Sequence, residues 1–205
     1  MIKLFVFDLG NVILPFEHRQ IATRLHAKSL MREGCSPSVL FDAMFDFEEG
    51  LVNPYEEGLV SSVEFFSELK HKFQLDMSLE DFKDIWNPIF QEDPSVNKAI
   101  LYLKEKGYPL FLLSNTNELH FSYIMEKYPI IHSFDEWLLS FEVGAKKPKR
   151  RIYDAIFEKM AIPPDAVFYI DDIPKYVEVA KQLGINGMIF KNADQLWEFI
   201  SKNGI

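Results

Sequence analysis

The amino-acid sequence predicts an α/β fold in which an all-helical segment interrupts a parallel β-sheet. Short apolar runs that end in polar or glycine residues begin the chain and return in its second half, as buried parallel strands do. Residues 16–93 lack such runs and carry repeated helix-start signals instead. We therefore expect a core domain from residues 1–15 and 94–205, and a helical domain from residues 16–93.

Composition limits the classes of function. With 205 residues, 48% of them hydrophobic, the chain is long enough to bury a large core. A formal net charge of -9 disfavours the phosphate attraction on which nucleic-acid binding depends, although it leaves room for one small phosphate. No run approaches the ~18 apolar residues of a membrane span, and the single Cys35 forms no internal disulfide. We expect a cytoplasmic protein with no nucleic-acid or membrane partner.

The first apolar run, Ile2 to Phe7, is followed directly by Asp8 and a Leu-Gly-Asn sequence. The run predicts a buried parallel strand, and ligands of open α/β sheets bind beyond the carboxyl ends of such strands. We therefore expect Asp8 to stand in a functional cleft. The alternative is that Asp8 caps a turn, because aspartate commonly accepts backbone hydrogen bonds there.

The interrupting segment contains signals for roughly four helices. Ser36-Pro37 is typical of an N-cap with proline at the first helical position, and Gly34 is expected to end the preceding helix. Ser61 fits a capping box, and Ser78 predicts another helix start. The segment is rich in aromatic residues, most of which we expect in its core: Phe41, Phe45, Phe47, Phe65, Phe66, Phe73, Phe82, Trp86 and Phe90.

From Asp93 onward, helices and strands alternate. Asp93-Pro94 opens a helix that Gly107 closes. This alternation of helices and strands predicts a parallel sheet covered by helices. The later strands are expected at residues 110–113, 137–140, 166–170 and 187–190, and the later helices at residues 151–160 and 177–183, with a last helix capped by Asn192.

Polar residues follow three of these strands, and their types suit phosphoryl transfer. They are Ser114-Asn115 after the second strand, Lys146-Lys147-Pro148 after the third, and Asp171-Asp172 after the fourth. Asp8 and Asp172 can hold Mg²⁺, which binds through one or two carboxylates plus water and phosphate oxygens. Ser114 and the amide of Asn115 can bind phosphate oxygens, and Lys147 can neutralise charge.

Nearly the whole chain resembles the haloacid dehalogenase (HAD) superfamily, whose four motifs occur here in order. They are matched by Asp8-Leu9-Gly10-Asn11-Val12, which lacks the second aspartate, by Ser114, by Lys147-Pro148 and by Asp171-Asp172. The helical segment resembles the family's type 1 cap. Asn115-Thr116-Asn117 resembles the epoxide-hydrolase-like and sugar-phosphatase branches, and Glu56-Glu57-Gly58 resembles a turn of small bacterial glucose-1-phosphate phosphatases. The resemblance implies a three-layer, Rossmannoid parallel sheet of strand order 5-4-1-2-3 beneath an inserted cap.

The resemblance also implies roles for individual residues. Asp8 would be the nucleophile that forms an aspartyl-phosphate. Mg²⁺ would be held by Asp8, the backbone carbonyl of Gly10 and Asp172, with Asp171 and Asn117 in support. Phosphate would be bound by Ser114, Asn115 and Lys147, of which Lys147 is also catalytic.

Gly10 departs from the family pattern, in which an aspartate usually serves as general acid and base. Such help is typically worth ~10² to 10⁴ in rate. A sugar 1-phosphate would suffer less, because its anomeric oxygen leaves more readily than an ordinary alkoxide. Otherwise Glu17 or His18 could supply a proton, although His18 is expected to be a solvated helix-start residue. We expect an Mg²⁺-dependent phosphatase of a small phosphorylated metabolite, with sugar 1-phosphates among the candidates.

Two alternatives stay open. A 2-haloacid dehalogenase would use the same Asp8 without a metal, whereas the Asp171-Asp172 pair favours one. A regulatory protein that binds a phosphorylated metabolite without turnover would also tolerate Gly10. The sequence further leaves open Lys146 as a rival of Lys147, Asn117 as a mere helix N-cap, the substrate, and a monomeric or homodimeric state.

Overall fold

The computed structural model describes residues 1–31 and 33–205, and its centre is a five-stranded parallel sheet. The spatial order β3-β2-β1-β4-β5 is the predicted 5-4-1-2-3 order read from the other edge, so the predicted fold class is confirmed. Phe7 of the central strand pairs with Leu112 on one side and Ile170 on the other. The strands are β1 (Leu4–Phe7), β2 (Leu110–Ser114), β3 (Glu136–Leu139), β4 (Val167–Asp171) and β5 (Asn186–Ile189).

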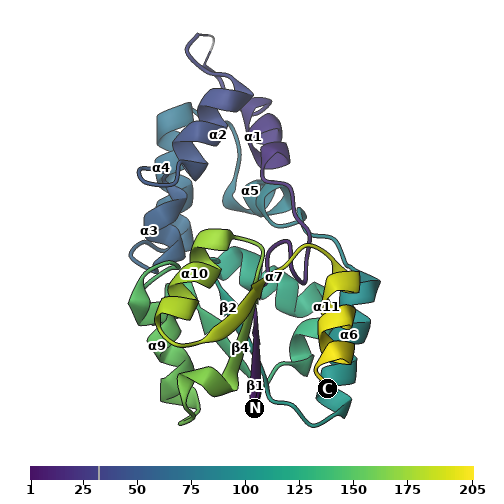
Figure 1. Ribbon diagram of the computed structural model, residues 1–205. Helices are drawn as coiled ribbons and strands as arrows, with labels where there is room; N and C mark the ends of the chain where they lie inside the picture. The colour runs from purple at the N-terminus through teal and green to yellow at the C-terminus, as the bar shows by residue number, and fades with distance from the viewer. Residues whose placement is uncertain (32) are drawn as a thin grey trace.

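Helices cover both faces of the sheet and make three layers (Figure 1). Because side chains alternate along a strand, Phe5 and Phe7 join one hydrophobic cluster while Leu4 and Val6 join another. The first cluster includes α6 (Pro94–Glu105), α7 (Glu118–Lys127) and α11 (Ala193–Lys202). The second includes α9 (Arg150–Lys159) and α10 (Pro174–Gln182).

The segment between β1 and α6 forms helices that stand beyond the carboxyl end of β1 (Figure 1). They share a separate hydrophobic core in which Phe65, Phe82 and Trp86 are buried, as expected. Phe47 is an exception, since 56% of it is exposed. Within the described residues there are five helices rather than four: α1 (Arg19–His26), α2 (Pro37–Phe45), α3 (Val52–Glu56), α4 (Ser62–Phe73) and α5 (Leu79–Trp86).

The helix-start signals are confirmed, and one stop signal is wrong. Ser36 accepts a hydrogen bond from the Val39 backbone, and Ser61 and Ser78 both form capping boxes. Gly34 ends no helix, because α1 already ends at His26. Gly34 instead has a φ of 70° in the connection to α2, a conformation that glycine adopts without steric cost.

The chain passes between the sheet and the helical segment twice, and the two crossings lie side by side. The Gln91 backbone N–H donates to the Pro15 carbonyl at 2.8 Å, and Phe16 and Phe90 form an antiparallel bridge. These contacts lie near the predicted boundaries at residues 16 and 93, which stay a prediction.

The remaining elements are short. Ser140 begins α8 (Ser140–Val143) where the third strand was expected to continue, and single 3₁₀ turns occupy Pro129–Ser133 and Pro164–Ala166. In the part of the chain that the structure describes, no helix combines the length and the apolar character needed to cross a membrane. The cytoplasmic location stays a prediction.

Candidate active site

Asp8 leaves the end of the central strand and faces a cavity of about 290 Å³ between the sheet and the helical segment. Its backbone N–H donates to the Ile170 carbonyl at 2.8 Å, which continues the ladder to β4 by one residue. Asp8 therefore has a fixed backbone and a nearly buried carboxylate. Five predicted site residues line this cavity: Asp8, Gly10, Asn115, Lys147 and Asp172.

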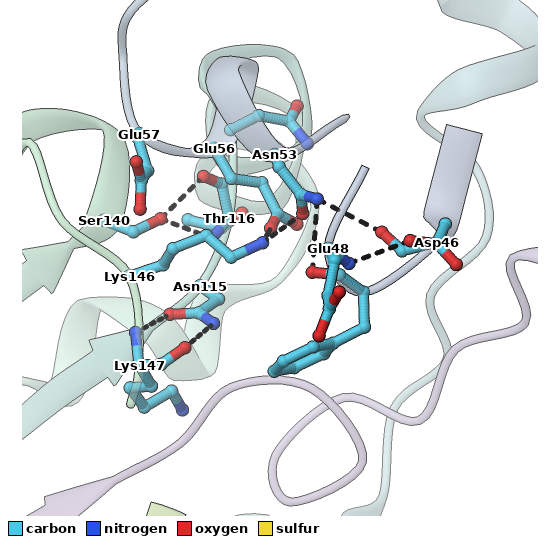
Figure 2. A network of polar contacts seen from close by, with 12 residues as sticks. Asp46, Glu48, Asn53, Glu56, Glu57, Asn115, Thr116, Ser140, Lys146 and Lys147 are labelled. Carbon is cyan, nitrogen blue, oxygen red and sulfur yellow. Dashed lines mark hydrogen bonds and ion pairs between the residues drawn. The ribbon is translucent and has the colours of Figure 1, made fainter. Parts of the chain in front are cut away.

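Lys147 joins two of the predicted carboxylates. Its Nζ atom donates to Asp8 Oδ1 at 2.6 Å and to Asp171 Oδ2 at 2.7 Å, with the side chain only 1% exposed. The Asn115 side chain holds the Lys147 backbone, accepting from its N–H at 2.7 Å and donating to its carbonyl at 3.1 Å (Figure 2). Lys146 instead contacts the helical segment, so the geometry favours Lys147 over its sequence rival.

Burial and neighbouring charges control the titration of this cluster. Burial raises the pKa of Asp8 to about 7; Lys147 opposes that rise and Asp171 adds to it. For Lys147, burial lowers the pKa but Asp8 and Asp171 outweigh it, so its pKa lies above the ordinary value and the ammonium stays charged. Burial, followed by the charge of Asp171, raises the pKa of Asp172.

The acidic residues fit a divalent cation. Asp8, Asp171 and Asp172 each offer a carboxylate oxygen, and these atoms lie within 4.8 Å of one another. Lys147 supplies one positive charge against three carboxylates, and hard oxygen ligands are the ones that Mg²⁺ prefers.

Asp171 is the least available of the three, because it already accepts bonds from Lys147, the Tyr169 hydroxyl and the Ile173 backbone. Asp8 and the half-buried Asp172 are therefore the better ligands.

Gly10 has a structural partner that the sequence did not reveal. A Cβ atom added to Gly10 would lie 2.4 Å from Cε1 of Phe16, well inside van der Waals contact. The usual second aspartate of the first motif would therefore require this ring to shift. An aromatic ring stands where the family's acid would begin, and Phe16 also lines the cavity.

His18 is not the solvated residue that was expected. It is half-buried, lines the cavity, and stacks on the Phe45 ring with centroids 4.3 Å apart. Burial lowers its pKa to about 4, so its imidazole is neutral at pH 7. Glu17 is exposed and accepts the Arg19 backbone N–H at 2.8 Å.

Three predicted residues lie behind or beside the cavity. Ser114 and Asp171 are buried at their strand ends. Asn117 is the N-cap of α7, as the alternative reading held, and its Oδ1 accepts from the His120 backbone at 3.1 Å and from Trp86 Nε1 at 3.3 Å. It thereby fastens α5 to the α/β core.

Phe45, Val52 and Asn53 also line the cavity, and no sequence motif marks them as site residues, because their position depends on how the helical segment sits over the strands. Glu56 lines the cavity too, although its sequence pattern indicates only a turn.

Comparisons with known proteins agree with this geometry. D-ribitol-5-phosphate phosphatase of Bacteroides thetaiotaomicron is 28% identical over 90% of this chain and 89% of its own. A phosphorylated carbohydrates phosphatase of Thermotoga maritima is 26% identical over 71% and 74% of the respective chains. A HAD family enzyme of Bacteroides thetaiotaomicron, solved with magnesium and inorganic phosphate, superposes with a TM-score of 0.80 at 25% identity, covering 93% of this chain and 95% of the other.

A more distant neighbour shares only the fold. The L-2-haloacid dehalogenase of Xanthobacter autotrophicus has a TM-score of 0.63 at 17% identity, over 91% of this chain and 76% of the other. The model of the haloacid dehalogenase-like hydrolase family matches residues 2–184, which include all four motifs. The predicted HAD-like hydrolase is thereby confirmed, and the chain belongs to the haloacid dehalogenase-like hydrolase family.

Proposed function

We propose that the protein is an Mg²⁺-dependent phosphatase of a small phosphorylated carbohydrate and works through an aspartyl-phosphate. The observation that carries the proposal is the cluster at the strand ends: Asp8 faces the cavity beside Lys147, with Asp172 close enough to share a cation. Phosphoryl transfer depends mainly on such positioning and charge stabilisation. The named phosphatases among the relatives support the same class of reaction.

In the first step, a carboxylate oxygen of Asp8 forms a bond to phosphorus as the bond from phosphorus to the carbohydrate oxygen breaks; that oxygen leaves with the bonding electron pair and takes a proton from solvent water. Water then attacks the phosphorus, which releases phosphate and restores the Asp8 carboxylate. Lys147 holds Asp8 in place and neutralises charge throughout. Mg²⁺, bound by Asp8, Asp172 and the Gly10 carbonyl, would supply further neutralisation of the phosphate and of the acidic cluster.

The leaving oxygen finds no acid at position 10, because Gly10 has no side chain and Phe16 occupies the adjoining space. Substrates whose oxygen leaves readily should therefore react fastest. Sugar 1-phosphates meet this condition through their anomeric oxygen, and they are the substrates that we propose to test first.

Phosphate release from glucose 1-phosphate and ribitol 5-phosphate, with and without Mg²⁺, tests the proposal. We expect Mg²⁺-dependent turnover, and a loss of roughly 10³-fold or more in Asp8→Asn, which keeps the shape but removes the nucleophile. Asp154→Asn, at an exposed ion pair on α9, is the matched control and should equal wild type. Release that is the same in Asp8→Asn and wild type would refute the role of Asp8.

A second candidate is a protein that binds a phosphorylated metabolite without turning it over. Phe16 beside Gly10 favours it, because the space for the usual acid is taken. Isothermal titration would then detect a phosphorylated carbohydrate binding tightly in the presence of Mg²⁺ while no phosphate appears. Dehalogenation is less well supported, since the family's dehalogenases need no metal and this site brings three carboxylates together.

A further inference from the structure

The wall of the cavity that faces the strand ends contains a second polar cluster, which the proposed chemistry does not use. Lys146 extends from the core loop toward α3, where its Nζ contacts Asn53 Oδ1 and lies 3.1 Å from Glu56 Oε2 (Figure 2). Its neighbour Lys147 reaches Asp8 instead. Two consecutive lysines thus contact opposite walls of one cavity, Lys146 the helical side and Lys147 the strand side.

The three side chains of this cluster differ in their free hydrogen-bonding groups. The Asn53 amide nitrogen already donates to the carbonyls of Asp46 at 3.1 Å and Phe47 at 3.3 Å, so Asn53 ties the loop after α2 to Lys146. Glu56 accepts from Lys146 through Oε2. Its Oε1 atom has no hydrogen-bond donor within residues 1–31 and 33–205.

Glu56 and Lys146 are partly open to the cavity, with 15% of each side chain exposed. A carboxylate oxygen and an ammonium hydrogen held side by side can accept from one hydroxyl and donate to another. Phe16, Phe45, Val52 and Tyr176 add aromatic and aliphatic surface to the lining of the same cavity. Such a wall suits the C–H faces of a carbohydrate, while a few polar groups fix its orientation.

The size of the cavity limits the leaving group. Its volume of about 290 Å³ lies at the small end of the ~300–1,000 Å³ typical of ligand pockets. Asn53 and Lys146 also line a neighbouring cavity, so their contact lies between the two. A single sugar or polyol fits such a space better than a nucleotide.

We propose that Glu56 and Lys146 form the subsite that recognises hydroxyl groups on the substrate's leaving group. This inference rests on the proposed phosphatase function and names its substrate class, the phosphate monoesters of monosaccharide-sized sugars and polyols. Glu56 and Lys146 determine specificity, while Asn53 is a positioning residue that holds Lys146 and the loop after α2.

Glu56→Gln and Lys146→Met test the subsite on matched substrates. The hydroxylated substrates are glucose 1-phosphate and ribitol 5-phosphate, and the substrate without hydroxyl groups is phenyl phosphate. We expect kcat/KM to fall at least ~10-fold for a hydroxylated substrate, as a lost hydrogen bond to a charged group implies, and to change less than ~3-fold for phenyl phosphate. Lys146→Arg keeps the charge and should recover part of the loss.

Glu57→Gln is the matched control. Glu57 is the next residue, its side chain is 14% exposed, and it pairs with Lys149 of the same loop, yet it does not line the cavity that holds Asp8. Glu57→Gln should leave the ratio of kcat/KM for a hydroxylated substrate to kcat/KM for phenyl phosphate at the wild-type level. Circular dichroism melting of each variant confirms that the fold is retained.

Equal losses on phenyl phosphate and on the hydroxylated substrates would overturn the proposal, because they would mean that the pair only fastens the helical segment to the core. An unchanged ratio in Glu56→Gln and Lys146→Met would overturn it as well. Failure of the phosphatase function itself looks different: wild type would then release no more phosphate than Asp8→Asn from any of the three substrates.

Discussion

The two walls of the cavity differ in how they are built. On the strand side, the Lys147 ammonium contacts the carboxylates of Asp8 and Asp171 at 2.6 and 2.7 Å, and all three side chains are almost fully buried. On the helical side, stacked rings such as His18 on Phe45 surround a partly open polar pair. The buried charges thus lie where the sheet backbone fixes them, and under the proposed function the inserted helices would shape the space for the rest of the substrate.

The largest effect on stability should come from removing the ammonium group of Lys147 on the strand side of the cavity. Lys147→Met leaves Asp8 and Asp171 buried without their partner, and breaking a buried ion pair typically costs about 3–5 kcal/mol in the free energy of unfolding. Urea denaturation followed by circular dichroism measures it. Lys149→Met, whose ion pair with Glu57 involves a largely exposed lysine, should cost less than about 1 kcal/mol. Similar losses in both variants would mean that burial of the Lys147 ion pairs adds nothing to what they contribute to stability.

An intermediate effect, on kcat, should follow from adding a carboxylate at Gly10 and removing the Phe16 ring beside it. Gly10→Asp alone should not raise kcat, because its Cβ meets the Phe16 ring at 2.4 Å. Gly10→Asp combined with Phe16→Ala opens that space and supplies an acid, so we expect a gain of up to ~10² on substrates with poor leaving groups such as glycerol 3-phosphate. Phe16→Ala alone is the control. If Gly10→Asp alone gives the full gain, Phe16 does not obstruct the acid.

The smallest effect should appear as a pH dependence of stability at the contact between the helical segment and α7, where His120 stacks on Trp86. Burial lowers the pKa of His120 to about 3 and that of His18 to about 4, below the ordinary 6.5. Between these values and pH 6.5 only the unfolded chain binds protons at these sites, so stability is present above pH 6.5 and is lost as the pH falls. From pH 6.5 to 5 each histidine should contribute a loss of about 2 kcal/mol.

Urea denaturation at pH 7 and at pH 5 checks this expectation. In His120→Gln the difference between the two free energies of unfolding should shrink by about 2 kcal/mol relative to wild type. His71→Gln, at an exposed position on α4, should leave the difference unchanged. If the free energy of unfolding of His120→Gln changes between pH 7 and pH 5 as much as that of wild type, His120 takes up its proton in the folded state too.

The hydrogen bonds of His120 agree with a neutral ring. The Asn117 amide donates to Nδ1 at 3.1 Å, and Nε2 donates to the Trp86 carbonyl at 2.9 Å. A second ring proton on Nδ1 would face a donor, which adds to the cost of protonation.

The strand-end residues could be predicted because they depend on local pattern. Apolar runs predict the strands, and parallel strands place their carboxyl ends at one edge of the sheet, so Asp8, Lys147 and Asp172 were expected together. Capping at Ser36, Ser61 and Ser78 is equally local, since each cap uses residues within one turn. The end of α1 was missed because a glycine can serve a loop as well as a helix end.

Local sequence patterns were enough to predict which polar groups follow which strand, the family motifs and the absent acid at Gly10. The fold was needed to show that Lys147 rather than Lys146 contacts Asp8, and to place Phe16 against Gly10. It also puts His18 in the cavity lining and pairs Lys146 with Glu56 across 90 residues of chain. Local patterns depend on residues a few positions apart, whereas these contacts depend on how one packed layer rests on another, and side-chain packing specifies that only in the folded molecule.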